Sequence, residues 1–297
     1  MTATADRSVV VVTIPVELPE IEGYVVVRGR LADHPDAIGV ICGPTERITA
    51  EELDAMPALR AVSVAGAGTD GLDRDALAQR GIPLTTAAES TAPATADLAM
   101  TLMLMAARRV DDSQALLREG RWPGWSFDDV PGKDLAGATL GLVGFGHIGR
   151  LVAARAAVFG MDVLHHTRTP TGEPGHVARL PDLLARSDVL SLHLPLTPAS
   201  RGLVGAAELD LLPAGAIVVN TARGGIVDEE ALCDRLDDGR LFAAALDVFE
   251  GEPTPRARLL TTPHLVLTPH VGSATRQTRH RMVSTAAERL AANLGTP

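Results

Sequence analysis

Short apolar runs alternate with longer helical patterns along almost the whole chain, and this alternation limits the possible folds more than any other feature. The runs are rich in Val, Ile and Leu and lack the polar alternation of a strand that faces water on one side. They occupy residues 9–13, 24–27, 38–42, 61–64 and 82–85, and then 139–143, 162–165, 189–193, 217–220, 243–248 and 265–267. Such strands are expected to be buried on both faces in parallel sheets covered by helices. The sequence therefore predicts an α/β, doubly wound fold.

The helical patterns and one irregular segment suggest how the chain is divided. Helices are predicted over residues 94–109, 148–159, 229–236 and 274–293. Residues 118–137 contain Pro, Gly, Trp and Asp and are predicted to form an ordered loop or arm. The chain has 297 residues, which is enough for about two domains. We predict one domain from residues 1–90 plus 275–297 and a second, nucleotide-binding domain from residues 91–274, because the last helix should pack back on the first domain.

Composition excludes several classes of function. The formal net charge is -10, which disfavours a nucleic-acid surface or an anionic membrane as a partner. Cys42 and Cys233 are too few for a disulfide framework and fit a reducing compartment. No His/Cys cluster has metal-ligand spacing, no apolar stretch is long enough to span a bilayer, and the N-terminus lacks the pattern of a signal peptide. We therefore expect a cytoplasmic protein without a metal.

A glycine-rich turn follows the apolar run at residues 139–143. The sequence "TLGLVGFGHIGR" places Gly144, Gly146 and Gly149 in a G-x-G-x-x-G pattern between a predicted strand and a predicted helix. Glycines with this spacing allow a tight turn and a close approach of the backbone to a pyrophosphate at the helix N-terminus. Methyltransferases that bind S-adenosylmethionine also use glycine-rich turns, so the turn by itself indicates a nucleotide site but no reaction.

Three later segments place reactive side chains where predicted strands end. Arg223 lies in "VVNTARGGIVDEEAL", Asp247 and Glu252 lie in "AALDVFEGEP", and His270 lies in "LVLTPHVGSAT". The carboxyl ends of parallel strands are where open α/β sheets hold their ligands. An Arg can hold a carboxylate in a bidentate fork, and a His can transfer a proton near neutral pH. A carboxylate on the second ring nitrogen would fix the tautomer and stabilise the charged ring.

With these motifs the chain resembles the D-isomer-specific 2-hydroxyacid dehydrogenase family, and in particular its glyoxylate/hydroxypyruvate reductases. The resemblance covers nearly the full length, because the segments "GAGTDGLD", "EGRW", "LVGFGHIGR", "HLPLTPASRGLVG", "NTARGGIVDEEAL", "ALDVFEGEP" and "LTPHVGSAT" occur in the family's order. It implies two Rossmann-like domains with the active site in the cleft between them. Residues 1–90 plus 275–297 would form a flavodoxin-like, substrate-binding domain, and the nucleotide domain would form a homodimer interface.

The resemblance also implies the roles of the reactive residues in a hydride transfer between NAD(P) and a 2-oxo acid. Arg223, with the backbone N–H groups of Ala67 and Gly68, would hold the substrate carboxylate. His270 would protonate the 2-oxo group during reduction and act as the base in the reverse direction. Glu252 would keep His270 protonated over a wider pH range.

A second group of residues is implied to bind the cofactor. Asp247 matches the position that holds the nicotinamide carboxamide in this family. The full set of implied cofactor residues is Gly144, Gly146, His147, Ile148, Gly149, Thr167, Arg168, Thr169, Leu194, Pro195, Thr221, Ala222, Asp247 and Gly272.

The stretch "HHTRTP" lacks the acidic residue that usually follows a glycine turn by about 20 residues. Thr167 stands where NAD-specific relatives carry Asp, which would repel a 2′-phosphate. Arg168 adds a guanidinium and Thr169 a hydroxyl, and both suit a phosphate. We therefore predict that NADP(H) is favoured over NAD(H). The alternative is that Arg168 points to solvent and that NAD is still used.

Differences between this chain and other members of the family limit the substrates that it is expected to use. Phosphoglycerate dehydrogenases place arginines at the positions of Cys42 and Val64, phosphite dehydrogenases place Lys at Ala67, and formate dehydrogenases pair the histidine with Gln instead of Glu252. We therefore predict that the substrate is a small 2-oxo acid such as glyoxylate or hydroxypyruvate, and a bulkier 2-oxo acid is an alternative. A second alternative is a dinucleotide-sensing corepressor of the same fold. Trp122 and Trp125 could line the site or simply anchor the arm.

Overall fold

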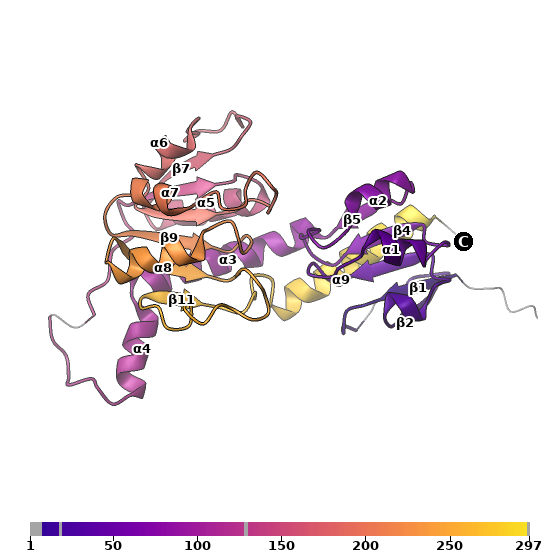
Figure 1. Cartoon of the computed structure of the whole chain (residues 1–297), viewed down its shortest axis with the longest axis horizontal. Coiled ribbons are helices and arrows are strands. Elements are labelled where there is room, and N and C mark those ends of the chain that lie inside the picture. The colour runs from indigo at the N-terminus through magenta and orange to yellow at the C-terminus, as the bar shows by residue number, and fades with distance from the viewer. Residues whose placement is uncertain (1–7, 18–19, 128–129, 296–297) are drawn as a thin grey trace, which may run out of the picture. The chain divides into compact units, whose positions relative to one another are not determined.

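Each apolar run that the sequence predicts to be a strand overlaps with a β-strand in the computed structural model, which describes residues 8–17, 20–127 and 130–295. The chain is divided into two compact units (Figure 1). Unit 1 comprises residues 1–92 and 273–297, and unit 2 comprises residues 93–272. Each unit contains its own parallel sheet with helices on both faces. The predicted α/β, doubly wound fold is therefore confirmed.

Unit 1 contains a five-stranded sheet in the order β2-β1-β3-β4-β5, and every neighbouring pair is parallel. This is the strand order of flavodoxin. The strands are β1 (Val9–Val12), β2 (Val25–Arg28), β3 (Gly39–Cys42), β4 (Ala61–Val64) and β5 (Leu84–Thr86). The helices are η1 (Leu31–Asp33), α1 (Ala50–Asp54), α2 (Arg74–Gln79) and α9 (Arg276–Leu294).

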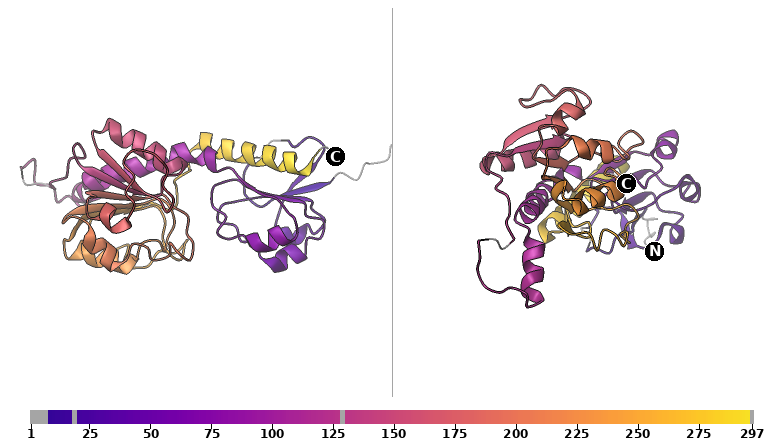
Figure 2. Two further views of the ribbon diagram at one scale, coloured as in Figure 1. Left: turned by 90° about the horizontal axis from the view of Figure 1, so that it is seen from above. Right: turned by 60° about the vertical axis from the view of Figure 1, so that its left-hand side comes forward.

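Successive residues of the central strands in unit 1 point to opposite faces, and each face has its own core. Val11 and its neighbours pack with Leu53 of α1 and Leu77 of α2. Val10 and its neighbours pack with Val283 and Leu290 of α9. Figure 2 shows α9 on one side of this sheet and α1 and α2 on the other.

Unit 2 contains a six-stranded parallel sheet in the order β11-β10-β9-β8-β6-β7. Its strands are β6 (Thr139–Val143), β7 (Asp162–His166), β8 (Val189–Leu192), β9 (Ala216–Asn220), β10 (Leu241–Leu246) and β11 (Leu265–Leu267). A single parallel bridge from His165 to His176 stands where a dinucleotide-binding sheet has its third strand. The chain reverses its direction of travel across the sheet between β6 and β8, and ligands bind at such a switch point.

Helices cover both faces of the sheet in unit 2. One face packs against α3 (Ala88–Ala107), whose first residues belong to unit 1, and against α5 (His147–Val158). The opposite face packs against α6 (Leu180–Leu184), α7 (Ala206–Leu211) and α8 (Glu229–Asp237). Because the six strands are parallel, their carboxyl ends lie at one edge of the sheet, where the loops that follow them meet.

Edge strands depart from the predicted burial. Central strands such as β3, β4 and β9 are buried throughout, as expected. The expectation is wrong for the edge strands β2, β5, β7 and β11, where most residues are half-buried or exposed. An edge strand has a neighbouring strand on one side only, so fewer atoms cover it.

The predicted arm is preceded by a helix that was not predicted from the sequence, α4 (Val110–Arg118). At the base of the arm, the Lys133 amide donates to the Ala107 carbonyl at 2.7 Å. The Phe242 ring lies 5.1 Å from Lys133 Nζ and 5.7 Å from the Arg109 guanidinium carbon. Within the described part of the chain, none of the helices has the length and apolar character needed to cross a lipid bilayer.

Candidate active site and nucleotide pocket

The glycine turn connects β6 to α5 in a conformation that requires two of its three glycines. Gly144 has a φ of 96°, and a Cβ atom there would lie 2.2 Å from the His193 carbonyl oxygen. A Cβ atom on Gly149 would lie 2.4 Å from the Gly144 carbonyl oxygen. Gly146 differs, because no atom lies within 4 Å of its Cβ position. The open space at Gly146, at the N-terminus of α5, suits the close approach of a pyrophosphate.

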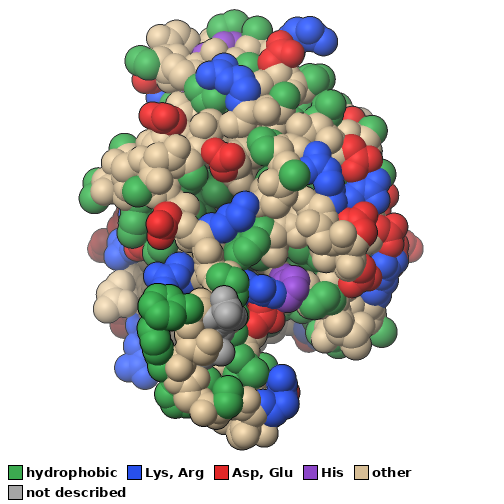
Figure 3. Space-filling view, turned by 90° about the vertical axis from the view of Figure 1, so that its left-hand side faces the viewer, with side chains coloured by type: hydrophobic (Ala, Val, Ile, Leu, Met, Phe, Trp, Pro, Cys, Tyr) green, Lys and Arg blue, Asp and Glu red, His purple; other side chains and the backbone are tan. Residues whose placement is uncertain are grey.

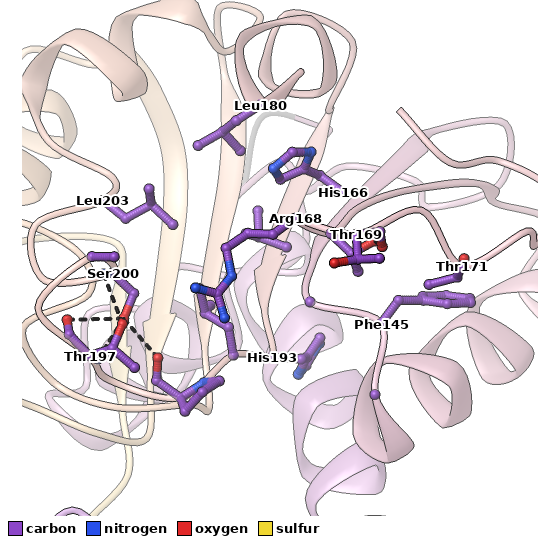
Figure 4. Close-up of a pocket in the computed structure, with 17 residues that line it drawn as sticks. Phe145, His166, Arg168, Thr169, Thr171, Leu180, His193, Thr197, Ser200 and Leu203 are labelled. Atoms are coloured by element: carbon purple, nitrogen blue, oxygen red, sulfur yellow. Dashed lines mark hydrogen bonds between the residues drawn. The ribbon is translucent and has the colours of Figure 1, made fainter. Parts of the chain in front are cut away.

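A pocket of about 460 Å³ opens beside this turn at the switch point between β6 and β8. It is formed by the loops that follow β6, β7 and β8 (Figure 4). Its lining includes the predicted cofactor residues Gly144, Gly146, Thr167, Arg168, Thr169, Leu194 and Pro195. It also includes Phe145, His166, Thr171, His193, Thr197 and Ser200, to which the sequence analysis assigned no role. The residues therefore fit a dinucleotide.

Residues 167–171 form one wall of the pocket, and we call them the selector loop. The Thr167 hydroxyl donates to the Thr169 carbonyl at 2.7 Å and so stabilises the turn. Arg168 is exposed, and Figure 4 shows its side chain pointing into the pocket. No carboxylate among the described residues forms an ion pair with Arg168, and none of the residues that line the pocket is acidic. This wall can therefore accept an additional negative charge.

The opposite wall, after β8, is held by the side chain of Ser200. The Ser200 hydroxyl donates to the Pro195 carbonyl at 2.7 Å and accepts the Thr197 amide at 2.7 Å. The Ser200 amide in turn donates to the Thr197 hydroxyl at 3.2 Å. Figure 4 shows these bonds at the edge of the pocket.

His193 lies beneath the glycine turn at the end of β8. Its Nε2 atom is 2.9 Å from the Ser191 hydroxyl, and its buried Nδ1 atom has no hydrogen-bond partner among the described residues. Burial lowers the pKa of the ring to about 4. The imidazole is therefore neutral at neutral pH and adds no charge next to the pocket.

The loop after β9 carries Arg223 and is braced from inside. The Asn220 side chain donates to the Arg223 carbonyl at 2.8 Å and accepts the Ala222 amide at 3.0 Å. The loop also packs directly on the segment after β10, because a Cβ atom on Gly224 would lie 2.0 Å from the Phe249 carbonyl carbon. Two segments that are far apart in the sequence are thereby held in contact.

His270 and Glu252 form a direct pair. The His270 Nδ1 atom lies 2.7 Å from Glu252 Oε2, and the other carboxylate oxygen accepts the Phe249 amide at 3.0 Å. Both side chains are about 30% exposed, at 31% and 27%, so they are accessible to a small molecule. The contact on Nδ1 leaves Nε2 as the ring nitrogen available for proton transfer.

Asp247 is buried below His270 and organises the loop that carries it. One carboxylate oxygen accepts the Thr268 hydroxyl at 2.6 Å and the Val271 amide at 2.8 Å, and the other accepts the Gly272 amide at 2.9 Å. Burial raises the pKa of this carboxyl group, and these three hydrogen bonds oppose the rise. The carboxylate therefore holds residues 268–272 in place.

The remaining predicted residues occupy other positions. His147, Ile148 and Gly149 form the first turn of α5, below the pocket. Thr221 and Ala222 are buried next to Arg223, and Gly272 is buried next to Asp247. Ala67 and Gly68 follow β4 in unit 1, and their amides donate no hydrogen bond to any described residue. The described residues include no group of side chains that could hold a metal ion.

A family model agrees with this geometry. The model of the NAD-binding domain of D-isomer specific 2-hydroxyacid dehydrogenases matches residues 100–272, which include the glycine turn, the pocket and the His270 loop.

Characterised relatives extend the similarity over most of the chain. A hydroxypyruvate reductase of Thermotoga maritima is 36% identical over 266 residues, which cover 88% of this chain and 86% of the relative. A glyoxylate reductase of Aeropyrum pernix is 42% identical over 258 residues, which cover 84% of this chain and 77% of the relative. The crystal structure of an NADPH-dependent glyoxylate/hydroxypyruvate reductase of Sinorhizobium meliloti matches with a TM-score of 0.86 and 31% identity, covering 98% of this chain and 96% of that one.

Proposed function

Since the chain belongs to the D-isomer specific 2-hydroxyacid dehydrogenase family, we propose that it reduces a small, unphosphorylated 2-oxo acid with NADPH as its preferred cofactor. Membership makes the chain an oxidoreductase that binds a pyridine nucleotide and acts on small 2-oxo or 2-hydroxy acids. The observation that carries the proposal is the pair formed by His270 and Glu252, at 2.7 Å, in the unit that also contains the nucleotide pocket.

His270 is the proton donor in this proposal. The cofactor, when bound, supplies the hydride, and the imidazolium gives a proton from Nε2 to the oxygen of the 2-oxo group. Glu252 stays on Nδ1 during this transfer, where its negative charge stabilises the protonated ring. In the reverse direction the neutral ring takes the proton from the 2-hydroxy acid.

Arg223 binds the substrate carboxylate in this proposal. Its guanidinium presents a planar set of donors that matches a carboxylate, and Asn220 holds the backbone of its loop. The amides of Ala67 and Gly68 are the second set of proposed donors to the same group.

The proposed cofactor contacts follow from the pocket for the pyrophosphate and from the family resemblance for the nicotinamide end. The backbone at Gly146 and the N-terminus of α5 suit the pyrophosphate, and Asp247 is proposed to hold the carboxamide of the nicotinamide. Thr221, Ala222 and Gly272 are proposed to contact the same end of the cofactor.

The preference for NADPH rests on the selector loop. Thr167 replaces the acidic residue that would repel a 2′-phosphate, and the Arg168 side chain points into the pocket without an acidic partner among the described residues. Thr169 adds a hydroxyl on the same wall. The similar Sinorhizobium meliloti enzyme is NADPH-dependent and was crystallised with NADP, which supports this assignment.

Glyoxylate and hydroxypyruvate are the proposed substrates. All three relatives reported above are reductases of one or both of these acids. Cys42 and Val64 stand where phosphoglycerate dehydrogenases carry arginines, and both are buried at the carboxyl end of their strands, so neither offers a positive charge to a phosphate.

Initial rates test the proposal directly. NADPH and NADH are compared with glyoxylate, hydroxypyruvate, pyruvate, phenylpyruvate and 3-phosphohydroxypyruvate at a common concentration. We expect the largest kcat/KM for glyoxylate or hydroxypyruvate with NADPH. The Arg168→Ala variant should raise the KM for NADPH and leave that for NADH nearly unchanged. An equal or larger kcat/KM with NADH would refute the cofactor preference, and a clear preference for the phosphorylated acid would refute the substrate.

We also propose that the chain forms a homodimer through the arm in unit 2. Four large apolar side chains on and after α4 are strongly exposed in the single chain, namely Leu117 at 63%, Trp122 at 51%, Trp125 at 76% and Phe127 at 89%. Figure 3, which faces this part of the molecule, shows hydrophobic side chains in green over the arm. Exposed apolar side chains that cluster in this way are typical of an interface.

A further inference from the structure

His165 lies directly behind the nucleotide pocket, and neither the catalytic set nor the cofactor set includes it. The side chain is fully buried at the end of β7, two residues before Thr167. Its ring stacks on Phe145 of the glycine turn, with 3.8 Å between the ring centroids and 12° between the planes. Its Nε2 atom lies 3.1 Å from the hydroxyl of Thr171, the last residue of the selector loop.

These contacts belong to a closed ring of interactions between the turn and the selector loop. The Arg150 guanidinium lies over the Phe145 ring, at 4.9 Å from the ring centroid. The same guanidinium pairs with Glu173 at 2.5 Å. The Glu173 amide donates to the Thr171 hydroxyl at 3.3 Å, which completes the ring. Figure 4 shows Phe145 and Thr171 on the same side of the pocket.

The glycine turn and the selector loop, which these interactions connect, face different parts of the proposed cofactor. Phe145 belongs to the turn that suits the pyrophosphate, and Thr171 ends the loop that carries Arg168. The Arg168 guanidinium is on a long, exposed side chain, so its position depends on how firmly the loop backbone beneath it is held. The buried His165 ring contacts both the glycine turn and the selector loop and so fixes the distance between them. A loop that is already held in place loses little conformational entropy when the cofactor binds.

We infer that His165 is a positioning residue, which holds the selector loop against the glycine turn through Thr171 and thereby sets the affinity for the 2′-phosphate of NADP(H). The inference rests on the proposed preference for NADPH. It assigns His165 no contact with the cofactor, so its effect must pass through Thr171 to the loop.

The surroundings of His165 require an uncharged ring for this role. The buried Nδ1 atom has no hydrogen-bond partner among the described residues, so a second ring proton would be an unpaired donor. Burial lowers the pKa of His165, and the nearby His176, Arg150 and His166 lower it further, whereas Glu173 opposes this shift. A neutral ring can stack on Phe145 without repulsion from Arg150.

Binding measurements on the whole protein test the inference. Dissociation constants for NADPH and NADH are measured by fluorescence titration for the wild type and for Thr171→Val, Thr171→Ser, His165→Phe and the double variant of Thr171→Val with His165→Phe. We expect Thr171→Val to raise the Kd for NADPH about 5-fold, because one hydrogen bond is lost, and to change the Kd for NADH less than about twofold. Thr171→Ser keeps the hydroxyl and should bind as the wild type does.

The double variant shows whether His165 and Thr171 affect the Kd for NADPH through the same hydrogen bond or independently. His165→Phe keeps the stacking but loses the bond to Thr171, so we expect the double variant to bind NADPH no more weakly than the weaker single variant. His280→Phe, at an exposed position of α9, is the matched control and should change neither Kd. If His165→Phe does not fold, the comparison of Thr171→Val with Thr171→Ser decides.

Two outcomes would overturn the inference. Equal losses for NADPH and NADH would show a general structural role, and unchanged NADPH affinity in Thr171→Val would show that the bond positions nothing. In both cases a wild type that prefers NADPH leaves the proposed function intact. A wild type that binds both nucleotides equally would instead refute the cofactor preference, and the inference with it.

Discussion

His270 occupies a left-handed backbone conformation, with a φ of 52°, which is uncommon for a residue with a side chain. Its amide donates to the Asp247 carbonyl at 2.8 Å, and the Asp247 carboxylate holds the amide of the next residue. The surrounding structure therefore maintains a conformation that local preferences disfavour. Backbone strain of this type is concentrated at functional sites.

The first prediction concerns the proton donor. In His270→Gln, kcat for reduction should fall about 100-fold or more, because Gln cannot give a proton near neutral pH. The Kd for NADPH should change less than about twofold, since the pocket does not include His270. Stopped-flow rates and fluorescence titration measure the two quantities. His280→Gln is the control, and a His270→Gln variant with near wild-type turnover would contradict the proposed role.

The second prediction concerns Glu252. In Glu252→Gln the side chain can still accept the Nδ1 proton of His270 but no longer stabilises the imidazolium by charge. Oxidation of the 2-hydroxy acid should therefore be about 10-fold slower than in the wild type, because the ring gains its positive charge during proton abstraction without a compensating carboxylate. Steady-state rates of oxidation measure the change. Glu250→Gln, which removes a surface ion pair with Arg201 and Arg256, should leave these rates unchanged.

The third prediction concerns His193 and stability. Its pKa is about 4 in the folded chain, and an unfolded histidine has a pKa of about 6.5. Between these values the unfolded chain binds a proton that the folded chain does not, so stability falls as the pH is lowered from about 6.5 towards about 4. This term amounts to about 2 kcal/mol between pH values of about 7.5 and about 5.

In His193→Gln this contribution should vanish. Urea unfolding curves of both proteins at the two pH values measure it. Between these pH values the free energy of unfolding should change by about 2 kcal/mol less in the variant than in the wild type. The same pH dependence in both proteins would mean that His193 is protonated in the folded chain.

At the scale of elements, the proposed catalytic set depends on contacts between loops rather than on the strands that carry them. The loop with Arg223 and the segment with Glu252 touch where Gly224 meets the backbone of Phe249. Ion pairs from Arg256 and Arg258 to residues 229–237 hold the following segment on α8. The strands determine where each loop begins, and these contacts determine where its side chains lie.

The fourth prediction tests the contact at Gly224. In Gly224→Ala the added methyl group would overlap with the Phe249 carbonyl, which would push the two loops apart. We expect kcat/KM to fall by about 100-fold, because displacements of about 1 Å cost that much in positioned sites, with little change in circular dichroism. Gly205→Ala is the control, since the nearest atom to its Cβ position is Glu208 Oε2, at 3.4 Å. Equal kcat/KM in both variants would contradict the argument.

The whole molecule raises the question of its oligomeric state. The exposed apolar side chains of the arm would be poorly solvated in a single chain, and a second copy would bury them. The arm is held at its base by Lys133 and Arg109 against Phe242, so it can present a defined surface.

The fifth prediction tests the dimer. Sedimentation velocity should give the mass of two chains for the wild type. Trp125→Glu should raise the dimer dissociation constant roughly 30-fold or more, as expected for a central aromatic residue of an interface. Leu260→Glu, at another exposed apolar position, should leave it unchanged. A monomeric wild type at micromolar concentration would refute the proposed homodimer.

The sequence by itself determined the fold class, the family and the strand after which each reactive residue lies. These properties depend on local patterns, namely the apolar runs, the glycine spacing and the order of the motifs around Arg223, Glu252 and His270. The absence of an acidic residue at Thr167 was equally visible. Each of these signals is contained in a few consecutive residues, so no knowledge of distant contacts was needed.

Only the tertiary structure decided which side chains meet. It placed His165 between Phe145 and Thr171, His193 beneath the glycine turn, and Gly224 against Phe249. It also left β2 and β7 partly exposed, although their composition resembles that of the buried strands. The reason is physical: burial and side-chain contacts depend on the order of the strands in the sheet, and that order is set by the packing of the whole unit.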